Sequence, residues 1–184
     1  AYVGLDNRAA GRTAGYLIAR FMGPLAHSRN ARVAMIVGSL RYRAHEEREA
    51  GFLHLFEEQF PLVQVVGVRE GQDDAERNYQ QARSLLEQHP DLAGIYNIGG
   101  GAEGIGRALK EAGLEHKVVF IGHGLTPDTR ALLIDGTLDA VINVNPQTVL
   151  LNAVRIFTNL RAGRPAMQGV ETPRGEVTIH SDAP

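Results

Sequence analysis

The sequence predicts an α/β protein built on a doubly wound parallel sheet. Between residues 31 and 145, short apolar segments alternate with segments of helical periodicity, a pattern typical of βαβ units. Each predicted strand is followed by a helix, and right-handed crossovers arrange the strands in the order 2-1-3-4-5. We therefore expect one five-stranded lobe with helices on both faces of its sheet.

The predicted strands are short apolar runs bounded by turn-forming or charged residues. They cover residues 32–38, 62–68, 93–98, 118–121 and 140–144. The tail becomes irregular after Gly163 and Pro165, with one further candidate strand at 176–180. This last strand lies outside the five strand-and-helix units.

The predicted helices carry apolar residues three and four positions apart. They cover residues 8–22, 45–59, 73–88, 102–112, 127–134 and 146–160. The first ends at Gly23-Pro24, and Gly113 follows the fourth. Asp73-Asp74 begins the third, because carboxylates accept hydrogen bonds from the unpaired N–H groups of a helix start.

The two ends of the chain are expected to belong to a second lobe. Residues 1–7 have the pattern of a strand end entering a helix, and they lack an initiator methionine. We interpret residues 1–30 as a remnant of this second lobe with a crossover helix. Residues 31–145 are expected to form the five-stranded lobe, and 146–184 a return helix and tail. The chain is thus expected to be a fragment of a longer protein.

Composition excludes several classes of function. The 184 residues carry a net charge of −2, which argues against a nucleic-acid-binding surface on this piece of chain. There is no cysteine, so disulfides and thiolate metal sites are excluded, which is compatible with a cytoplasmic location. No apolar run reaches the length of a membrane span.

Two cofactor-like patterns are weaker than their alternatives. Residues 99–104 match the spacing G-x-G-x-x-G of a dinucleotide site, but no carboxylate follows about 20 positions later. A wide loop that lets something pass close to the backbone explains these glycines better. His45 and His123 both follow strands, yet they lack metal-ligand spacing. With no catalytic set, we expect neither an enzyme nor a cofactor.

The loop from Gly38 to Phe52 holds the most informative residues. A strand that ends at a glycine and opens into a helix places side chains at the carboxyl ends of the strands, where open α/β sheets bind ligands. Arg48 falls on the first turns of that helix, from which its planar fork could hold paired hydroxyls or a carboxylate. The other strand-end loops are polar as well, which suits a small polyhydroxylated or charged ligand.

The order and spacing of several motifs resemble the effector-binding domain of LacI/GalR-type transcriptional regulators. These motifs are Val3-Gly-Leu-Asp6-Asn7 with Gly11, Gly38-Ser-Leu, Arg48-Glu-Ala-Gly51-Phe52, Gly104-Ile-Gly106 and Gly136-Thr-Leu. The same periplasmic-binding-protein-like fold serves type I periplasmic sugar-binding proteins. The resemblance implies a cytoplasmic regulator with two lobes that close over a sugar-like effector, a homodimer in the full-length protein, and an upstream helix-turn-helix that binds operator DNA. The alternative is a periplasmic sugar-binding protein of an ABC transporter.

The resemblance also implies a ligand site, and Arg48 matches the arginine that grips ligand hydroxyls in that family. Three matched positions depart from the family pattern, at Gly100-Gly101, Gly124 and Val144, and their small or apolar side chains favour a larger ligand, such as a glycoside or a sugar acid. We expect other polar groups to replace the lost hydrogen bonds. The predicted ligand-binding residues are Arg48, Tyr42, Asn97, Gly101, Glu103, His123, Gly124 and Asn145.

Overall fold

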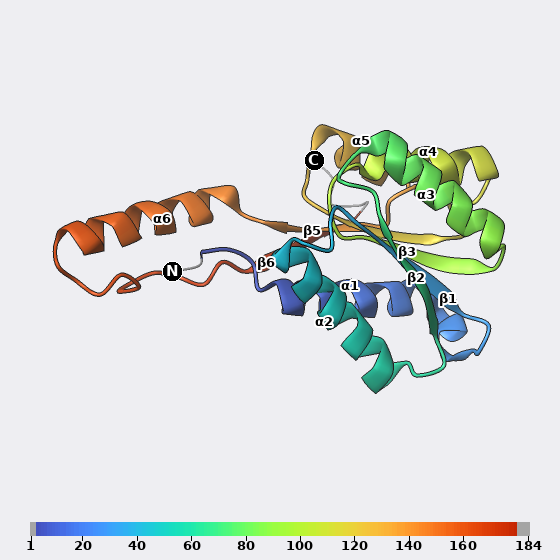
Figure 1. The fold of residues 1–184 in the computed structure, drawn as a ribbon, viewed down its shortest axis with the longest axis horizontal. Coiled ribbons are helices and arrows are strands. Elements are labelled where there is room, and N and C mark those ends of the chain that lie inside the picture. The colour runs from blue at the N-terminus through green and yellow to red at the C-terminus, as the bar shows by residue number, and fades with distance from the viewer. Residues whose placement is uncertain (1–2, 180–184) are drawn as a thin grey trace.

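Six strands form one sheet in the order β2-β1-β3-β4-β5-β6 (Figure 1). In this computed structural model, which describes residues 3–179, the first five strands are parallel and β6 pairs antiparallel with β5. The predicted fold class and the order 2-1-3-4-5 are confirmed. The candidate strand at 176–180 extends this sheet, although His180 itself lies outside the described residues, as do residues 1 and 2 of the expected strand end.

The helices and strands lie close to their predicted positions. The strands are β1 Arg32–Val37, β2 Gln64–Glu70, β3 Leu92–Asn97, β4 Val119–His123, β5 Ala140–Val144 and β6 Gly175–Ile179. The helices are α1 Asn7–Met22, α2 Arg43–Gln59, α3 Ala75–Gln88, α4 Ala102–Ala112, α5 Pro127–Ile134 and α6 Pro146–Arg161. The sequence prediction omitted the 3-10 helix at Gly23–His27, which continues from α1.

Two hydrophobic cores cover the two faces of the sheet. On one face α1 and α2 pack against the strands, and on the other α3, α4 and α5 do so (Figure 1). Ala14 and Ile18 of α1 are fully buried in the first core. The predicted boundary at residue 30 stays untested, but α1 contributes to the packing of this lobe and not only to a second one.

Helices α1 and α2 cross in backbone contact. A Cβ placed on Gly11 would overlap the carbonyl oxygen of Arg48 and lie 2.7 Å from its carbonyl carbon. A Cβ on Gly51 would overlap the carbonyl oxygen of Arg8 in the same way. Because neither glycine has a side chain, the two helices approach more closely than any larger residue allows.

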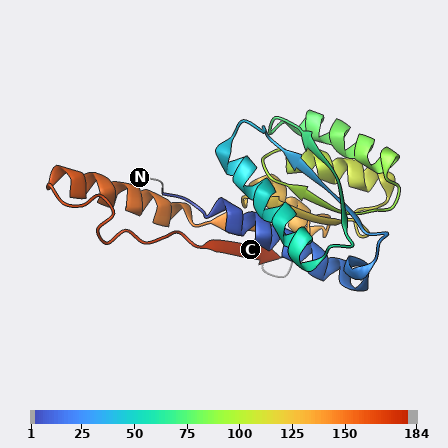
Figure 2. The same cartoon turned by 60° about the horizontal axis from the view of Figure 1, so that its bottom comes forward.

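Helix α6 stands apart from the rest of the lobe (Figures 1 and 2). Residues 163–174 run back beside it, held where Asn152 and Asn159 donate to the carbonyl oxygens of Glu171 and Gln168, at 2.7 and 2.8 Å. Its other side is apolar and uncovered, with Leu150, Leu151, Val154, Phe157 and Leu160 each 55% to 69% exposed. No helix within residues 3–179 is long and apolar enough to cross a membrane.

The crossing of α1 and α2 predicts a cost for the substitution Gly11→Ala. Alanine is favoured over glycine inside a helix by about 1 kcal/mol, so helix propensity alone would stabilise the variant. Overlap with the Arg48 carbonyl instead forces the helices apart. We expect the free energy of unfolding to fall by about 1–3 kcal/mol, the usual cost of overpacking, measured by urea denaturation of the full-length protein.

Gly67→Ala is the matched control for this measurement. Gly67 lies in β2, and the atom nearest to its added Cβ is the end of the Arg69 side chain at 3.6 Å, an ordinary contact. This variant should stay close to the wild-type stability. Equal stability of the Gly11→Ala and Gly67→Ala variants would contradict the proposed helix contact.

Candidate functional site

A hollow of about 490 Å³ lies at the carboxyl ends of the parallel strands. The first turns of α2 and the loops after β2, β3 and β4 contribute to its wall, together with the end of β5 and the first residues of the chain's described part. Its polar and glycine residues are Gly4, Asn7, His45, Arg48, Asp73, Gly99, Gly100, His123, Gly124 and Asn143, and its apolar ones are Leu5, Ala44, Ile98, Ile142, Val144 and Val149. This is the edge at which open α/β sheets bind ligands.

Arg48 is fixed at the wall of the hollow by two hydrogen bonds. Its Nε donates to Oδ1 of Asn7 at 2.9 Å, and its Nη1 donates to the carbonyl oxygen of Ile98 at 2.8 Å. Asn7 is the first residue of α1, and Ile98 directly follows β3. The guanidinium is therefore oriented by two separate elements, which lowers the entropy cost of holding a ligand.

His123 reaches the hollow from the end of β4 as a neutral imidazole. Its Nε2 lies 2.6 Å from the hydroxyl of Tyr96, which is fully buried on the neighbouring strand. Burial lowers the pKa of His123 well below 6.5, with smaller contributions from the positive charge of Arg48 and from His45. The Tyr96 hydroxyl then donates to Nε2, since burial also raises the pKa of this phenol and keeps it protonated.

His45 lines the hollow beside Arg48. Its Nδ1 accepts from the backbone N–H of Ser39 at 3.4 Å, and only 9% of the residue is exposed. Burial lowers the pKa of His45, against a raising contribution from Asp73 and with a smaller lowering one from Arg48. A neutral ring with Nδ1 as acceptor carries its proton on Nε2, so His45 is a hydrogen-bond donor near physiological pH.

Asp73 enters the hollow from the loop between β2 and α3. Its Oδ1 accepts from the backbone N–H of Gly100 at 2.7 Å. It is also one of two neighbouring non-glycine residues with a left-handed backbone, with φ of 55° at Gln72 and 56° at Asp73. The sequence analysis assigned Asp73 to a helix start together with Asp74. The structure separates the two, because Asp74 alone caps α3, accepting from the N–H of Arg77 at 2.8 Å.

The structure brings three of the predicted site residues into the hollow and places five elsewhere. Arg48, His123 and Gly124 line it. Asn97 is 1% exposed, and its Nδ2 donates to the carbonyl oxygens of Gly99 and Gly100, so it shapes the loop after β3.

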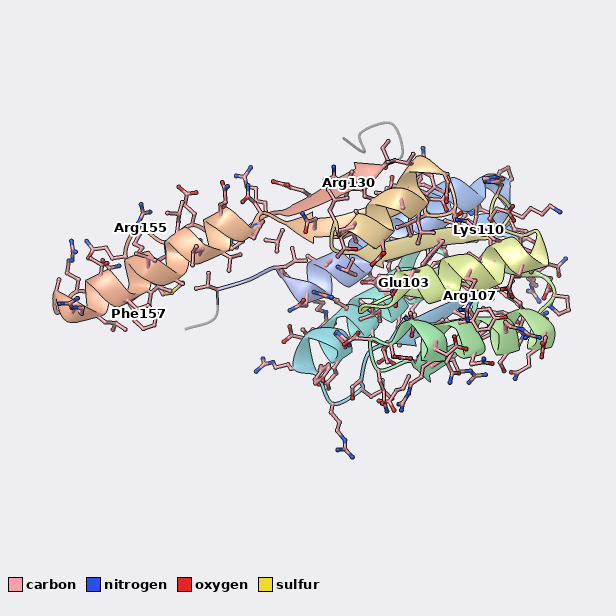
Figure 3. The ribbon with its side chains drawn as sticks, turned by 90° about the horizontal axis from the view of Figure 1, so that it is seen from above. Glu103, Arg107, Lys110, Arg130, Arg155 and Phe157 are labelled. Carbon is pink, nitrogen blue, oxygen red and sulfur yellow. The ribbon has the colours of Figure 1, made fainter. Side chains whose placement is uncertain are left out.

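The other four predicted residues have local structural functions. Gly101, with φ of 70°, begins α4, and a Cβ on it would lie 2.9 Å from the carbonyl carbon of Asp74. Tyr42 precedes α2 with its ring 55% exposed, and Glu103 is an exposed residue of the first turn of α4 (Figure 3). Asn145 caps α6, accepting from the N–H groups of Gln147 and Thr148.

The glycines at 99–104 serve the packing of α3 against α4. A Cβ on Gly104 would overlap the carbonyl oxygen of Ala75, and Gly101 touches the same turn of α3. The place that a pyrophosphate would need is thus occupied by the start of another helix. Within residues 3–179, no group of three or more histidine, aspartate or glutamate side chains is arranged to hold a metal ion.

A sequence model described as periplasmic binding protein domain matches residues 1–165. The chain belongs to this family. The type I periplasmic-binding-protein-like fold expected from the sequence is therefore confirmed, and the structure forms one lobe of such a two-lobed fold. The narrower prediction of a LacI-type regulator gains no support from the family assignment.

Two known proteins are similar over most or all of this chain. A glucose-galactose binding protein from Geobacillus stearothermophilus superposes with a TM-score of 0.89 at 28% identity, covering 100% of this chain and 64% of that one. The D-allose-binding periplasmic protein of Escherichia coli is 23% identical over 160 residues, 86% of this chain and 50% of the relative. The chain thus spans about half the length of this curated relative.

A third similarity shows the fold alone. A solute-binding protein from Actinobacillus succinogenes, solved with bound D-allose, superposes with a TM-score of 0.86 at 22% identity. It covers 99% of this chain and 63% of its own. In all three comparisons this chain corresponds to only part of the longer relative.

The neutral state of His123 predicts a loss of stability in acid. Below about pH 6.5 the unfolded chain binds a proton on this histidine that the folded protein does not bind, so the free energy of unfolding falls as the pH falls. The slope contributed by one such histidine is at most about 1.4 kcal/mol per pH unit. In His123→Gln, urea denaturation between pH 7.5 and 5 should show a shallower pH dependence than in the wild type.

His116→Gln is the control, at an exposed histidine outside the hollow. It should keep the wild-type slope. If His123→Gln also keeps it, His123 is not held neutral by burial beside Tyr96.

Proposed function

We propose that this chain is the carboxyl-terminal lobe of a sugar-binding protein that delivers its ligand to an ABC transporter. The observation that carries the proposal is the guanidinium of Arg48, fixed by Asn7 and Ile98 at the polar hollow. The binding proteins named above supply the ligand class, since one is described for glucose and galactose and another for D-allose.

The hollow suits the two kinds of surface that a sugar presents. Arg48 donates to hydroxyl oxygens, and the N–H of His45 adds a second donor on the same wall. Ile142, Val144 and Val149 offer apolar contact to the C–H groups of a sugar ring. A few convergent polar groups in a partly apolar concavity are typical of small-molecule sites.

The second half of the site is supplied by the other lobe of the full-length protein. The uncovered apolar side of α6, with Phe157 69% exposed, supports this arrangement (Figure 3). The length of the relatives supports it as well, because this chain covers only 64% and 50% of the two proteins. A sugar bound between two lobes stabilises the closed state by its greater affinity for that state.

The location and partners follow from the transport proposal and differ from our first expectation. We place the full-length protein outside the cytoplasm, because the D-allose-binding relative is described as a periplasmic protein. A LacI-type regulator that binds operator DNA as a homodimer is the second candidate, favoured by the spelling of the motif at Arg48–Phe52.

The residues encoded upstream of Ala1 separate the two candidates. A secretion signal ahead of an amino-terminal lobe supports the transport protein, whereas a basic helix-turn-helix contradicts it. This comparison requires only the sequence of the parent gene.

Arg48→Ala is expected to weaken sugar binding strongly in the full-length protein. Loss of a charged hydrogen-bond donor costs about 1.5–3 kcal/mol, so the dissociation constant should rise roughly 10-fold to 100-fold. Titration calorimetry with D-glucose, D-galactose, D-allose and arabinose measures this change.

Arg43→Ala is the matched control, one turn earlier on α2. Arg43 is 88% exposed in its side chain and pairs with Glu47 on the surface, away from the hollow. Its removal should leave the affinity unchanged. Equal affinities of the Arg48→Ala variant and the wild type would remove Arg48 from the site, and a folded wild type that binds none of these sugars would contradict the proposed function.

A further inference from the structure

Asp73 has a backbone conformation that is rare for a residue other than glycine. Both Gln72 and Asp73 have positive φ, a region that residues other than glycine seldom enter, and two in succession are costlier than one. Strained backbone of this kind is unfavourable and is concentrated at functional sites. Here it turns the chain so that the exposed Asp73 side chain lines the hollow, as Arg48 does, whereas Asp74 caps α3.

Two glycines leave the room that this carboxylate fills. A Cβ on Gly38 would lie 2.5 Å from Cγ of Asp73, and a Cβ on Gly99 would overlap its Oδ1. The same point beside Gly99 is 3.1 Å from Cε1 of His45. We expected room for a larger ligand at Gly100-Gly101, Gly124 and Val144. A Cβ on Gly100 would lie 3.2 Å from Cβ of Asp73, whereas the space beside Gly124 is open.

The Asp73 carboxylate has acceptor capacity left over. Oδ1 accepts from the N–H of Gly100, while no donor within residues 3–179 is bonded to Oδ2. A carboxylate offers about four lone-pair positions and accepts short, strong hydrogen bonds from hydroxyl groups. The wall of the hollow thus combines donors, at Arg48 and His45, with one acceptor of opposite charge.

We propose that Asp73 is a specificity-determining residue of this site, whose carboxylate accepts a hydrogen bond from a hydroxyl of the bound sugar. The assignment rests on the proposed sugar-binding function and narrows its ligand class. A neutral monosaccharide with a hydroxyl at this position is selected. A sugar acid is selected against, because its carboxylate would be repelled by the negative charge of Asp73.

The competing explanation is that Asp73 only ties down the loop at Gly100. Asp73→Asn distinguishes the two. Asparagine tolerates a left-handed backbone and keeps an Oδ1 for the Gly100 N–H, but it replaces Oδ2 by a donor and removes the charge. Asp74→Asn is the matched control, because it makes the same change one residue later at the cap of α3, where asparagine caps as well as aspartate.

The experiment is titration calorimetry on the full-length protein with D-glucose, D-galactose, D-allose, arabinose, D-glucuronate and D-galacturonate. The neutral sugar that binds wild type is then compared with its monodeoxy analogues. In the wild type, one deoxy analogue should bind about 10-fold to 100-fold more weakly than the parent sugar, as expected for a lost hydrogen bond to a charged group. The Asp73→Asn variant should also bind the parent sugar weakly. Its affinity for that same deoxy analogue should be only slightly lower than its affinity for the parent sugar.

The outcomes separate this proposal from the function on which it rests. Support requires that Asp73→Asn keeps the wild-type Tm, that Asp74→Asn keeps the wild-type affinity, and that neutral sugars bind more tightly than the two uronates. Two outcomes overturn the specificity assignment while the sugar-binding function stands. In the first, wild type and Asp73→Asn bind the sugar equally well. In the second, Asp73→Asn has a lower Tm and its affinity falls by the same factor for the parent sugar and for every analogue. If a folded wild type binds none of the six compounds, both are overturned.

Discussion

The backbone contact between α1 and α2 sets the geometry on which the site depends. Gly11 and Gly51 allow the two helices to touch, and the carbonyl of Arg48 lies in that contact. The amino-terminal end of α1 then falls beside the first turns of α2, where Oδ1 of Asn7 meets Nε of Arg48 at 2.9 Å. A wider crossing would separate these two groups, so the position of the Arg48 guanidinium is fixed by two residues without side chains.

The fold was predictable because its pattern is local and repeated. Each strand is an apolar run with its own turn residues, so the alternation could be recognised along the chain without knowledge of long-range contacts. The packing position of α1 was harder to predict from the sequence. Its apolar face shows that it packs, and Ile18 is fully buried, but periodicity does not say which sheet receives the helix.

The candidate site was predictable only where a residue type and a strand end sufficed, as at Arg48. Asn97 follows the same rule, yet its amide nitrogen bonds the carbonyls of Gly99 and Gly100. The position of Asp73 in the hollow was not predicted, because the sequence Gln72-Asp73-Asp74 does not indicate two residues with left-handed backbone. The glycines at 99–104 show the same difficulty, since close approach of a pyrophosphate and close approach of a helix start require the same absent side chains.

The link between the lobe and α6 has a mechanical consequence. The chain leaves β5 at Val144 to form α6 and returns to β6 at Gly175, and these two residues are partners in the antiparallel ladder. Exit and return therefore begin from two paired residues of the same two-stranded ribbon. Such a two-stranded ribbon bends or twists about its long axis far more easily than its two strands slide past each other. Motion of α6 relative to the lobe is thereby reduced to few degrees of freedom. This favours a reproducible rotation of α6 over the unrestricted motion that a flexible linker allows.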